Sequence, residues 1–108
     1  MIELTAQQVQ EKISANEDFI LDCFTLWCGP CKVLKPTFEK VSQSVISEGK
    51  EVQMYTLDVE ENRDLAVSLG IRAVPTIKAF SNGKEVFSQT GLQTDSQLKS
   101  LVENVLNG

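Results

Sequence analysis

The chain has 108 residues, of which 42% are hydrophobic and 23% charged, and it carries a formal net charge of −5. This length suits one domain covering residues 1–108, whose core is large enough to fold without covalent staples. The acidic balance and the lack of a basic run argue against nucleic acid or an anionic membrane as a partner. The first residues do not read as a signal peptide and no apolar stretch could span a bilayer, so we expect a cytoplasmic protein.

The first half of the chain contains clear start and stop signals for two helices. Thr5 and Gln8 form a capping-box signature, which predicts that a short helix begins after Thr5. The nearly continuous apolar run of residues 19–26 is typical of a buried parallel strand. Pro30 is predicted at the first position of a long helix, where its missing N–H would have no intrahelical partner. Gly49 should end that helix.

The second half of the chain is predicted to contain a hairpin and a final helix. Asn82-Gly83 is the strongest short hairpin signal in the sequence. Thr94 and Gln97 repeat the capping-box pattern ahead of an amphipathic segment, which predicts the last helix. The remaining elements expected here are a strand at 52–59, a helix at 63–69, and strands at 76–80 and 85–89.

The order of elements predicts the fold class. We expect the strands and helices to follow the order β-α-β-α-β-α-β-β-α along the chain. The first strand of this order precedes the first helix, and no residue range is predicted for it. Strand-helix-strand units imply an α/β fold with a central sheet between helices on both faces. The final antiparallel hairpin makes the sheet mixed, with about five strands flanked by about four helices.

The sequence WCGPCK at residues 27–32 places Cys28 and Cys31 two residues apart. Such a pair could bind a metal, form a permanent disulfide, or open and close a disulfide as chemistry. A closed zinc site needs four ligands, but the chain has no histidine and only Cys23 as a further thiol, so we expect no metal. A disulfide that closes so short a loop would add little stability.

Redox chemistry is the favoured interpretation of the cysteine pair, because Cys28 lies where a strand ends and a helix begins. Free N–H groups and the positive end of the helix dipole stabilise a thiolate at this position. The thiolate is the reactive form of cysteine, so its pKa should be lowered. A C-x-x-C pair beside a strand-helix-strand pattern is typical of thioredoxin-like redox motifs.

The segment LDCFTLWCGPCKVLKP resembles the active-site segment of thioredoxins, and AVPT, FSNGKEV and TGL follow in the same order. The chain is therefore similar to the thioredoxin family over essentially its whole length. The resemblance implies a thioredoxin fold and a protein-disulfide reductase that works through a reversible Cys28–Cys31 disulfide without a bound cofactor. It also implies protein disulfides as substrates, a flavoprotein thioredoxin reductase as electron donor, and a monomer. The alternative is a thioredoxin-shaped binding module whose redox chemistry is incidental.

Three residues are expected to carry the reaction. Cys28, the outer cysteine at the helix tip, should attack the target disulfide, and Cys31 should resolve the mixed disulfide. Asp22 shares a strand face with Phe24 and Leu26, so it should be buried and its pKa should rise. The resemblance implies that Asp22 exchanges a proton with Cys31; the plainer alternative is a structural aspartate at a sheet edge.

A docking surface for target proteins is expected around the cysteine pair. From the resemblance, Pro75 should form a cis peptide bond and face the cysteines. The Val74 backbone could then pair with an extended substrate segment. The alternative for Pro75 is a simple strand-entry proline. The other expected docking residues are Trp27, Gly29, Pro30, Gly91 and Leu92. Trp27 could instead fill the core, and Gly91 could equally be a plain strand-end turn.

The sequence departs from the family pattern at several positions near Asp22. Thr56 stands where many thioredoxins place a lysine, and loss of that cation should move the Asp22 pKa further upward. Leu26 replaces a residue that is often polar. Cys23 and Phe24 replace the common Phe-Trp pair, and Cys23 is expected to be an inert core residue.

Overall fold

The computed structural model describes residues 1–108, and its elements follow the expected order. The unassigned opening strand is β1. The elements are β1 (Ile2–Leu4), α1 (Ala6–Ser14), β2 (Phe19–Phe24), α2 (Gly29–Ser47), β3 (Gln53–Asp58), α3 (Arg63–Ser68), β4 (Thr76–Ser81), β5 (Lys84–Thr90) and α4 (Asp95–Asn107).

The capping boxes predicted for the first and last helices are both confirmed. The Thr5 hydroxyl accepts a hydrogen bond from the Gln8 backbone N–H, and the Gln8 side chain accepts one from the Thr5 N–H. Thr94 and Gln97 make the same reciprocal pair at the start of α4. Each box satisfies two N–H groups that have no partner within the helix, so it fixes where the helix begins.

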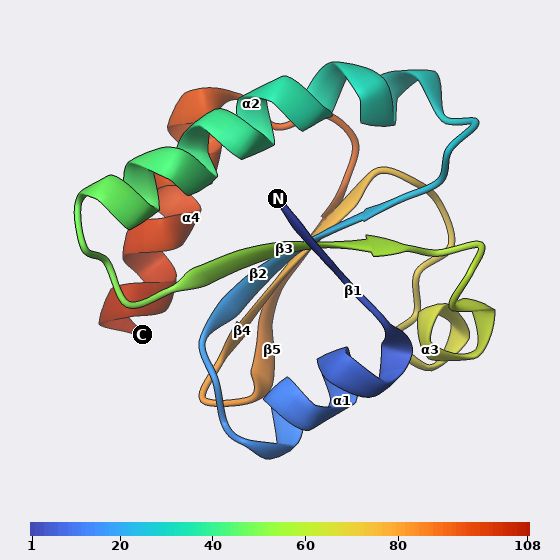
Figure 1. The fold of residues 1–108 in the computed structure, drawn as a ribbon, viewed down its shortest axis with the longest axis horizontal. Coiled ribbons are helices and arrows are strands. Elements are labelled where there is room, and N and C mark those ends of the chain that lie inside the picture. The colour runs from blue at the N-terminus through green and yellow to red at the C-terminus, as the bar shows by residue number, and fades with distance from the viewer.

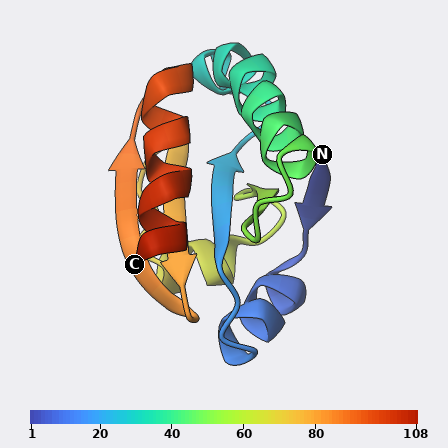
Figure 2. The same ribbon diagram turned by 90° about the vertical axis from the view of Figure 1, so that its left-hand side faces the viewer.

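The sheet has five strands in the order β1-β3-β2-β4-β5. The pairs β1–β3 and β2–β3 are parallel, whereas β2–β4 and β4–β5 are antiparallel. The expected mixed sheet is therefore confirmed. In the turned view of Figure 2, β5 and β1 lie at opposite edges of the molecule.

Helices cover both faces of this sheet, as Figure 1 shows. One core lies between the sheet and the pair α2 and α4, and it contains Phe38 and Leu98. The second core lies on the face that α1 and α3 cover, and it contains Phe19 and Leu57. None of the four helices combines the length and the apolar character needed to cross a membrane.

The strand predicted at residues 19–26 is two residues shorter in the structure. Its last ladder pair joins Phe24 to Asp58, which is also the last residue of β3. The chain then turns, and the Cys28 N–H donates to the Thr25 carbonyl. Leu26 lies outside the strand with 62% of its surface exposed, so its predicted place on the buried face is wrong. The predicted strands β3 and β5 differ from the observed ones by one residue at each end, and β4 and α3 differ by one residue at one end.

The predicted hairpin between β4 and β5 is confirmed. Asn82 and Gly83 connect the two strands with φ values of 55° and 75°. Two successive residues with positive φ are the geometry that an Asn-Gly turn favours.

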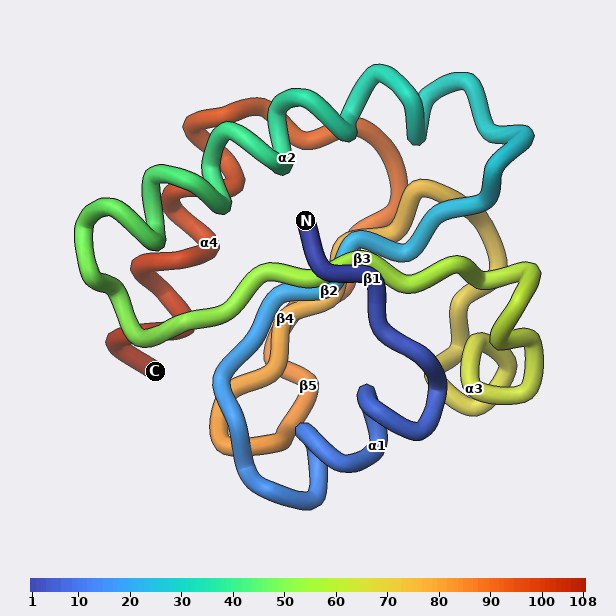
Figure 3. Tube along the Cα trace, viewed as in Figure 1, coloured from blue at the N-terminus to red at the C-terminus, as the bar shows by residue number.

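The strand register brings distant segments together at one end of the sheet. Cys23 near the end of β2 pairs with Thr76 at the start of β4. The turn that leads into α2 therefore lies at the same end as the segment before β4, as the trace in Figure 3 shows. In an open α/β sheet this end, beyond the carboxyl ends of the parallel strands, is where ligands bind.

Candidate active site

Cys28 is the N-cap residue of α2 and adopts an extended backbone, with φ −92° and ψ 110°. The backbone N–H of Cys31 donates a hydrogen bond to Cys28 Sγ at 3.1 Å. Gly29 is the first helical residue and Pro30 the second, so Pro30 lies one position later than expected. The backbone N–H of a second helical residue also has no intrahelical partner, so proline is tolerated there. A thiolate at Cys28 would therefore be stabilised by a directed N–H group and by the helix dipole.

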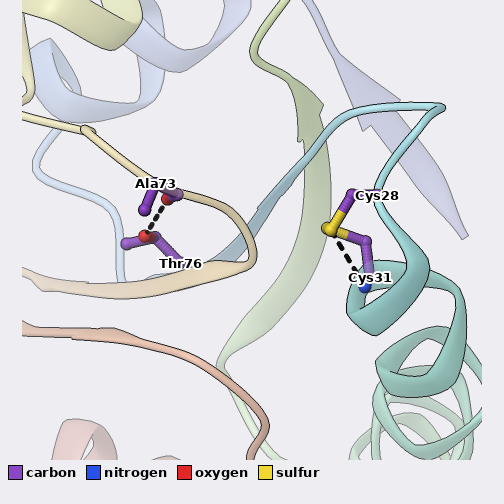
Figure 4. The surroundings of a disulfide bond; sticks show 4 residues. All are labelled: Cys28, Cys31, Ala73 and Thr76. Atoms are coloured by element: carbon purple, nitrogen blue, oxygen red, sulfur yellow. Dashed lines mark hydrogen bonds between the residues drawn. A yellow bond between two sulfur atoms is a disulfide. The ribbon is translucent and has the colours of Figure 1, made fainter.

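Cys28 and Cys31 form a disulfide, with 5.2 Å between their Cα atoms. Figure 4 shows the pair at the first turn of α2. Cys28 is half-buried, whereas only 4% of the Cys31 surface is exposed. The two sulfurs are thus placed as the sequence predicts, one outer and one inner.

The segment 73–76 forms a turn that bends toward the two cysteines in Figure 4. The Val74–Pro75 peptide bond is cis, as the family resemblance predicts. The Thr76 hydroxyl donates to the Ala73 carbonyl at 2.6 Å and closes the turn. The Gly91 N–H donates to the Pro75 carbonyl at 2.8 Å, so the β5 end is tied to the same turn.

The expected docking residues differ in their exposure. Trp27 and Leu92 are large apolar side chains with 84% and 54% of their surface exposed. Val74 is half-buried, and Pro75 is buried. The residues Gly29 and Pro30 are exposed, and Gly91 is half-buried. Exposed apolar side chains are therefore present at Trp27, beside Cys28 in the chain, and at Leu92, which follows the β5 end that is tied to the 73–76 turn; their use in docking stays a prediction.

Asp22 is buried in the middle of the sheet, with 3% of its surface exposed, as expected. Its Oδ1 atom has no hydrogen-bond partner in the protein. Burial raises the pKa of the Asp22 carboxyl from its ordinary value of 3.8 to about 7. A carboxyl with this pKa can both accept and release a proton near neutral pH.

A cavity of about 420 Å³ is lined by both Asp22 and the inner cysteine, Cys31. The other polar residues that line it are Glu3, Thr25, Lys32, Lys35, Glu39 and Thr56. Glu3, Thr25 and Glu39 were not singled out from the sequence, because β1, the turn after β2 and α2 come together only in the folded chain. This space is large enough to hold water.

Cys23, the third cysteine, is fully buried and carries no disulfide. Burial, together with the neighbouring Asp22, raises the pKa of its thiol well above the ordinary range. The thiolate is the reactive form, so Cys23 behaves as the inert core residue that the sequence predicts.

Comparisons with known proteins agree with this geometry. The family model described as "Thioredoxin" matches residues 1–104. A thioredoxin of Buchnera aphidicola is 32% identical over 108 residues, covering 99% of this chain and 97% of the relative. Thioredoxin Asp f 29 of Aspergillus fumigatus is 38% identical over 87 residues, which are 80% of this chain and 77% of the relative.

Solved structures of thioredoxins have the same fold as this chain. A chloroplastic thioredoxin z superposes with a TM-score of 0.85 at 29% identity, covering 100% of this chain and 96% of that chain. Other relatives carry the words "chloroplastic" or "mitochondrial" in their names, so the similar proteins are spread over several compartments. The expected thioredoxin fold is confirmed, and Cys28 and Cys31 are a redox-active dithiol. The chain belongs to the thioredoxin family of protein-disulfide reductases.

Proposed function

We propose that Cys28 is the attacking and Cys31 the resolving sulfur when the chain reduces an exposed disulfide in another protein. The observation that carries this order is the difference in exposure between the two cysteines. Cys28 is half-buried at the helix tip, whereas Cys31 is 4% exposed and lies inside the first turn. A target disulfide can therefore approach Cys28 but not Cys31.

The reaction passes two electrons from the dithiol to the target. The Cys28 thiolate attacks one target sulfur, and the other target sulfur leaves as a thiolate that takes a proton from solvent. Cys31 then loses its proton and attacks Cys28 Sγ, which forms the Cys28–Cys31 disulfide. The bond between Cys28 and the target breaks in this step, and the second target sulfur leaves as a thiolate.

Asp22 is proposed to take the proton from Cys31 in the second step. Both residues line the same cavity, and Asp22 Oδ1 has no competing hydrogen bond. The pKa of about 7 supports this role, because such a carboxyl can accept a proton and later return it to solvent near neutral pH.

The target is proposed to dock on the apolar surface around Cys28. Trp27 and Leu92 supply exposed apolar area, and Val74 supplies backbone groups for pairing with an extended segment. Pro75 has no N–H and so leaves this edge free of its own donor. The remaining proposed docking residues are Gly29, Pro30 and Gly91.

The dithiol needs an external reductant after each turnover, and we propose a flavoprotein thioredoxin reductase as the donor. We also propose that residues 1–108 act as one monomeric domain in the cytoplasm. An odd number of cysteines, with Cys23 buried and unpaired, fits a reducing compartment better than a disulfide scaffold.

The order of attack can be tested by trapping. The variant Cys31→Ser should accumulate a covalent adduct with a disulfide-containing protein, because nothing is left to resolve the mixed disulfide. Adducts are counted by non-reducing electrophoresis and mass spectrometry. Cys28→Ser is the matched control and should trap nothing; trapping through Cys28→Ser, with none through Cys31→Ser, would reverse the assignment.

A further inference from the structure

Three polar side chains form one row across the edge of the sheet beside the redox pair. Glu3 in β1 is the register partner of Thr56 in β3, and Thr56 is the register partner of Asp22 in β2. Register partners on neighbouring strands point to the same face of a sheet. All three line the cavity that also contains Cys31. Asp22 at the inner end is buried, whereas Glu3 at the outer end is exposed.

We propose that Thr56 and Glu3 form a proton path between Asp22 and solvent, which serves the resolving step. The inference rests on the role proposed above for Asp22. After the Cys31 thiol has given its proton to the Asp22 carboxylate, Asp22 passes a proton to the Thr56 hydroxyl through cavity water. Thr56 donates its own proton onward to the Glu3 carboxylate, and Glu3 releases it to solvent. Thr56 is left unchanged, and one proton has moved from Cys31 to solvent.

The geometry requires an intermediate group between the two carboxyls. Neighbouring strands lie about 4.8 Å apart, so the backbones of Asp22 and Glu3 are separated by roughly 10 Å. Thr56 lies between them, and a hydroxyl can donate and accept hydrogen bonds at the same time. The cavity volume of about 420 Å³ is far larger than the space that one water occupies, about 30 Å³.

The Asp22 carboxyl at the inner end of the row has one oxygen without a partner. Asp22 Oδ1 is enclosed and makes no hydrogen bond within the protein, although a buried polar atom normally has a partner. Asp22 also lines the cavity, so its exchange of protons with cavity water goes through the part of the side chain that the cavity exposes and not through Oδ1.

The other charged side chains that line this cavity are Lys32, Lys35 and Glu39 of α2, and Met1, which carries the N-terminal ammonium group, lines it as well. An ammonium group has hydrogen-bond donors only, so the two lysines cannot receive the proton. Glu39 could accept one, but it lies on the opposite wall and outside the row of register partners. It therefore provides a control that removes the same charge from the same cavity.

The resolving step can be followed directly in a single turnover. Reduced protein is mixed with 5,5′-dithiobis(2-nitrobenzoate), and the second release of the coloured thiolate reports attack by Cys31 on the mixed disulfide at Cys28. Thr56→Val keeps the side-chain shape without the hydroxyl and should slow this release by about threefold or more between pH 6 and 8. Thr56→Ser keeps the hydroxyl and should stay within about twofold of the parent rate.

The outer end of the path is tested by a pair of charge-matched variants. Glu3→Gln should slow the release as Thr56→Val does, whereas Glu39→Gln should leave it unchanged. Imidazole buffer added at rising concentration should restore the rate of Thr56→Val, because a small base can enter the cavity in place of the path. Circular dichroism and the Asp22 titration midpoint, measured by carbon NMR, are recorded for every variant.

The outcomes separate this path from the role of Asp22 itself. Parent-like release in Thr56→Val and Glu3→Gln, with slow release in Asp22→Asn, would overturn the path and leave Asp22 in place. Parent-like release in Asp22→Asn would overturn both. The path is also refuted if a shifted Asp22 midpoint accounts for the whole change in rate, or if imidazole gives no rescue.

Discussion

Replacing Cys28 with serine should remove the reductase activity, lowering turnover by on the order of 10³-fold or more, as loss of a covalent nucleophile does in other enzymes. The serine hydroxyl does not ionise near neutral pH, so neither the Cys31 N–H nor the dipole of α2 has a thiolate to stabilise. The measurement is the rate at which the variant reduces insulin disulfides with dithiothreitol as the external reductant.

The control for this loss is Cys23→Ala. Cys23 is fully buried and unpaired, so this variant should keep the parent turnover while losing some stability. Thermal unfolding of both variants shows that they are folded during the assay. Turnover by Cys28→Ser at a rate near that of the parent would mean that another group is the nucleophile.

The oxidised protein should lose stability as the pH rises from about 4 to about 7, because Asp22 must ionise in a buried position. The folded-state pKa of Asp22 is raised from 3.8 to about 7, so between these values the folded state holds a proton that the unfolded state has lost. The free energy of unfolding should therefore fall through this window and level off above pH 7. The total change corresponds to roughly 4 kcal/mol.

Urea unfolding of the oxidised chain between pH 4 and 8.5 measures this change. Asp22→Asn, which cannot ionise, should lack most of the fall and should be more stable than the parent at pH 8. Asp64→Asn is the control, since it removes an exposed carboxyl from α3 and should leave the parent slope in place. An identical pH dependence in the parent and in Asp22→Asn would show that Asp22 is not protonated in the folded state.

Local signals account for the parts of the fold that the sequence predicts well. The capping boxes at Thr5 and Thr94 and the Asn82-Gly83 turn each depend on residues within four positions of one another. The residues within each signal are enough to indicate its geometry. For the same reason the tip of α2, with Cys28 as its cap, could be placed from the sequence.

The features that the sequence did not reveal depend on register between strands. The family resemblance indicated that Thr56 lies near Asp22, but nothing in the sequence indicated that Glu3 comes into line with both of them across three strands. The premature end of β2 has a similar origin, because Phe24 reaches the last residue of β3. Leu26 continues the apolar run, but it has no ladder partner.

The burial of Lys78 is a second feature that the sequence did not reveal. A lysine within an apolar strand pattern gives no sign of burial, yet only 3% of its surface is exposed. Its ammonium group pairs with Glu85 at 2.7 Å and donates to the Ser88 hydroxyl at 3.1 Å. Both partners come from β5, so they are known only once the register of the hairpin is known.

Because β2 and β4 pair antiparallel, the turn that follows β4 lies at the opposite end of the sheet from the turn that follows β2. Phe19 at the start of β2 pairs with Phe80, so the Asn82-Gly83 turn lies a full strand length from Cys28. An affinity tag or a surface linker inserted at this turn would leave Cys28 and the apolar surface around it unobstructed. The chain can therefore be immobilised there with its thiols facing the solution, ready to capture substrates for identification.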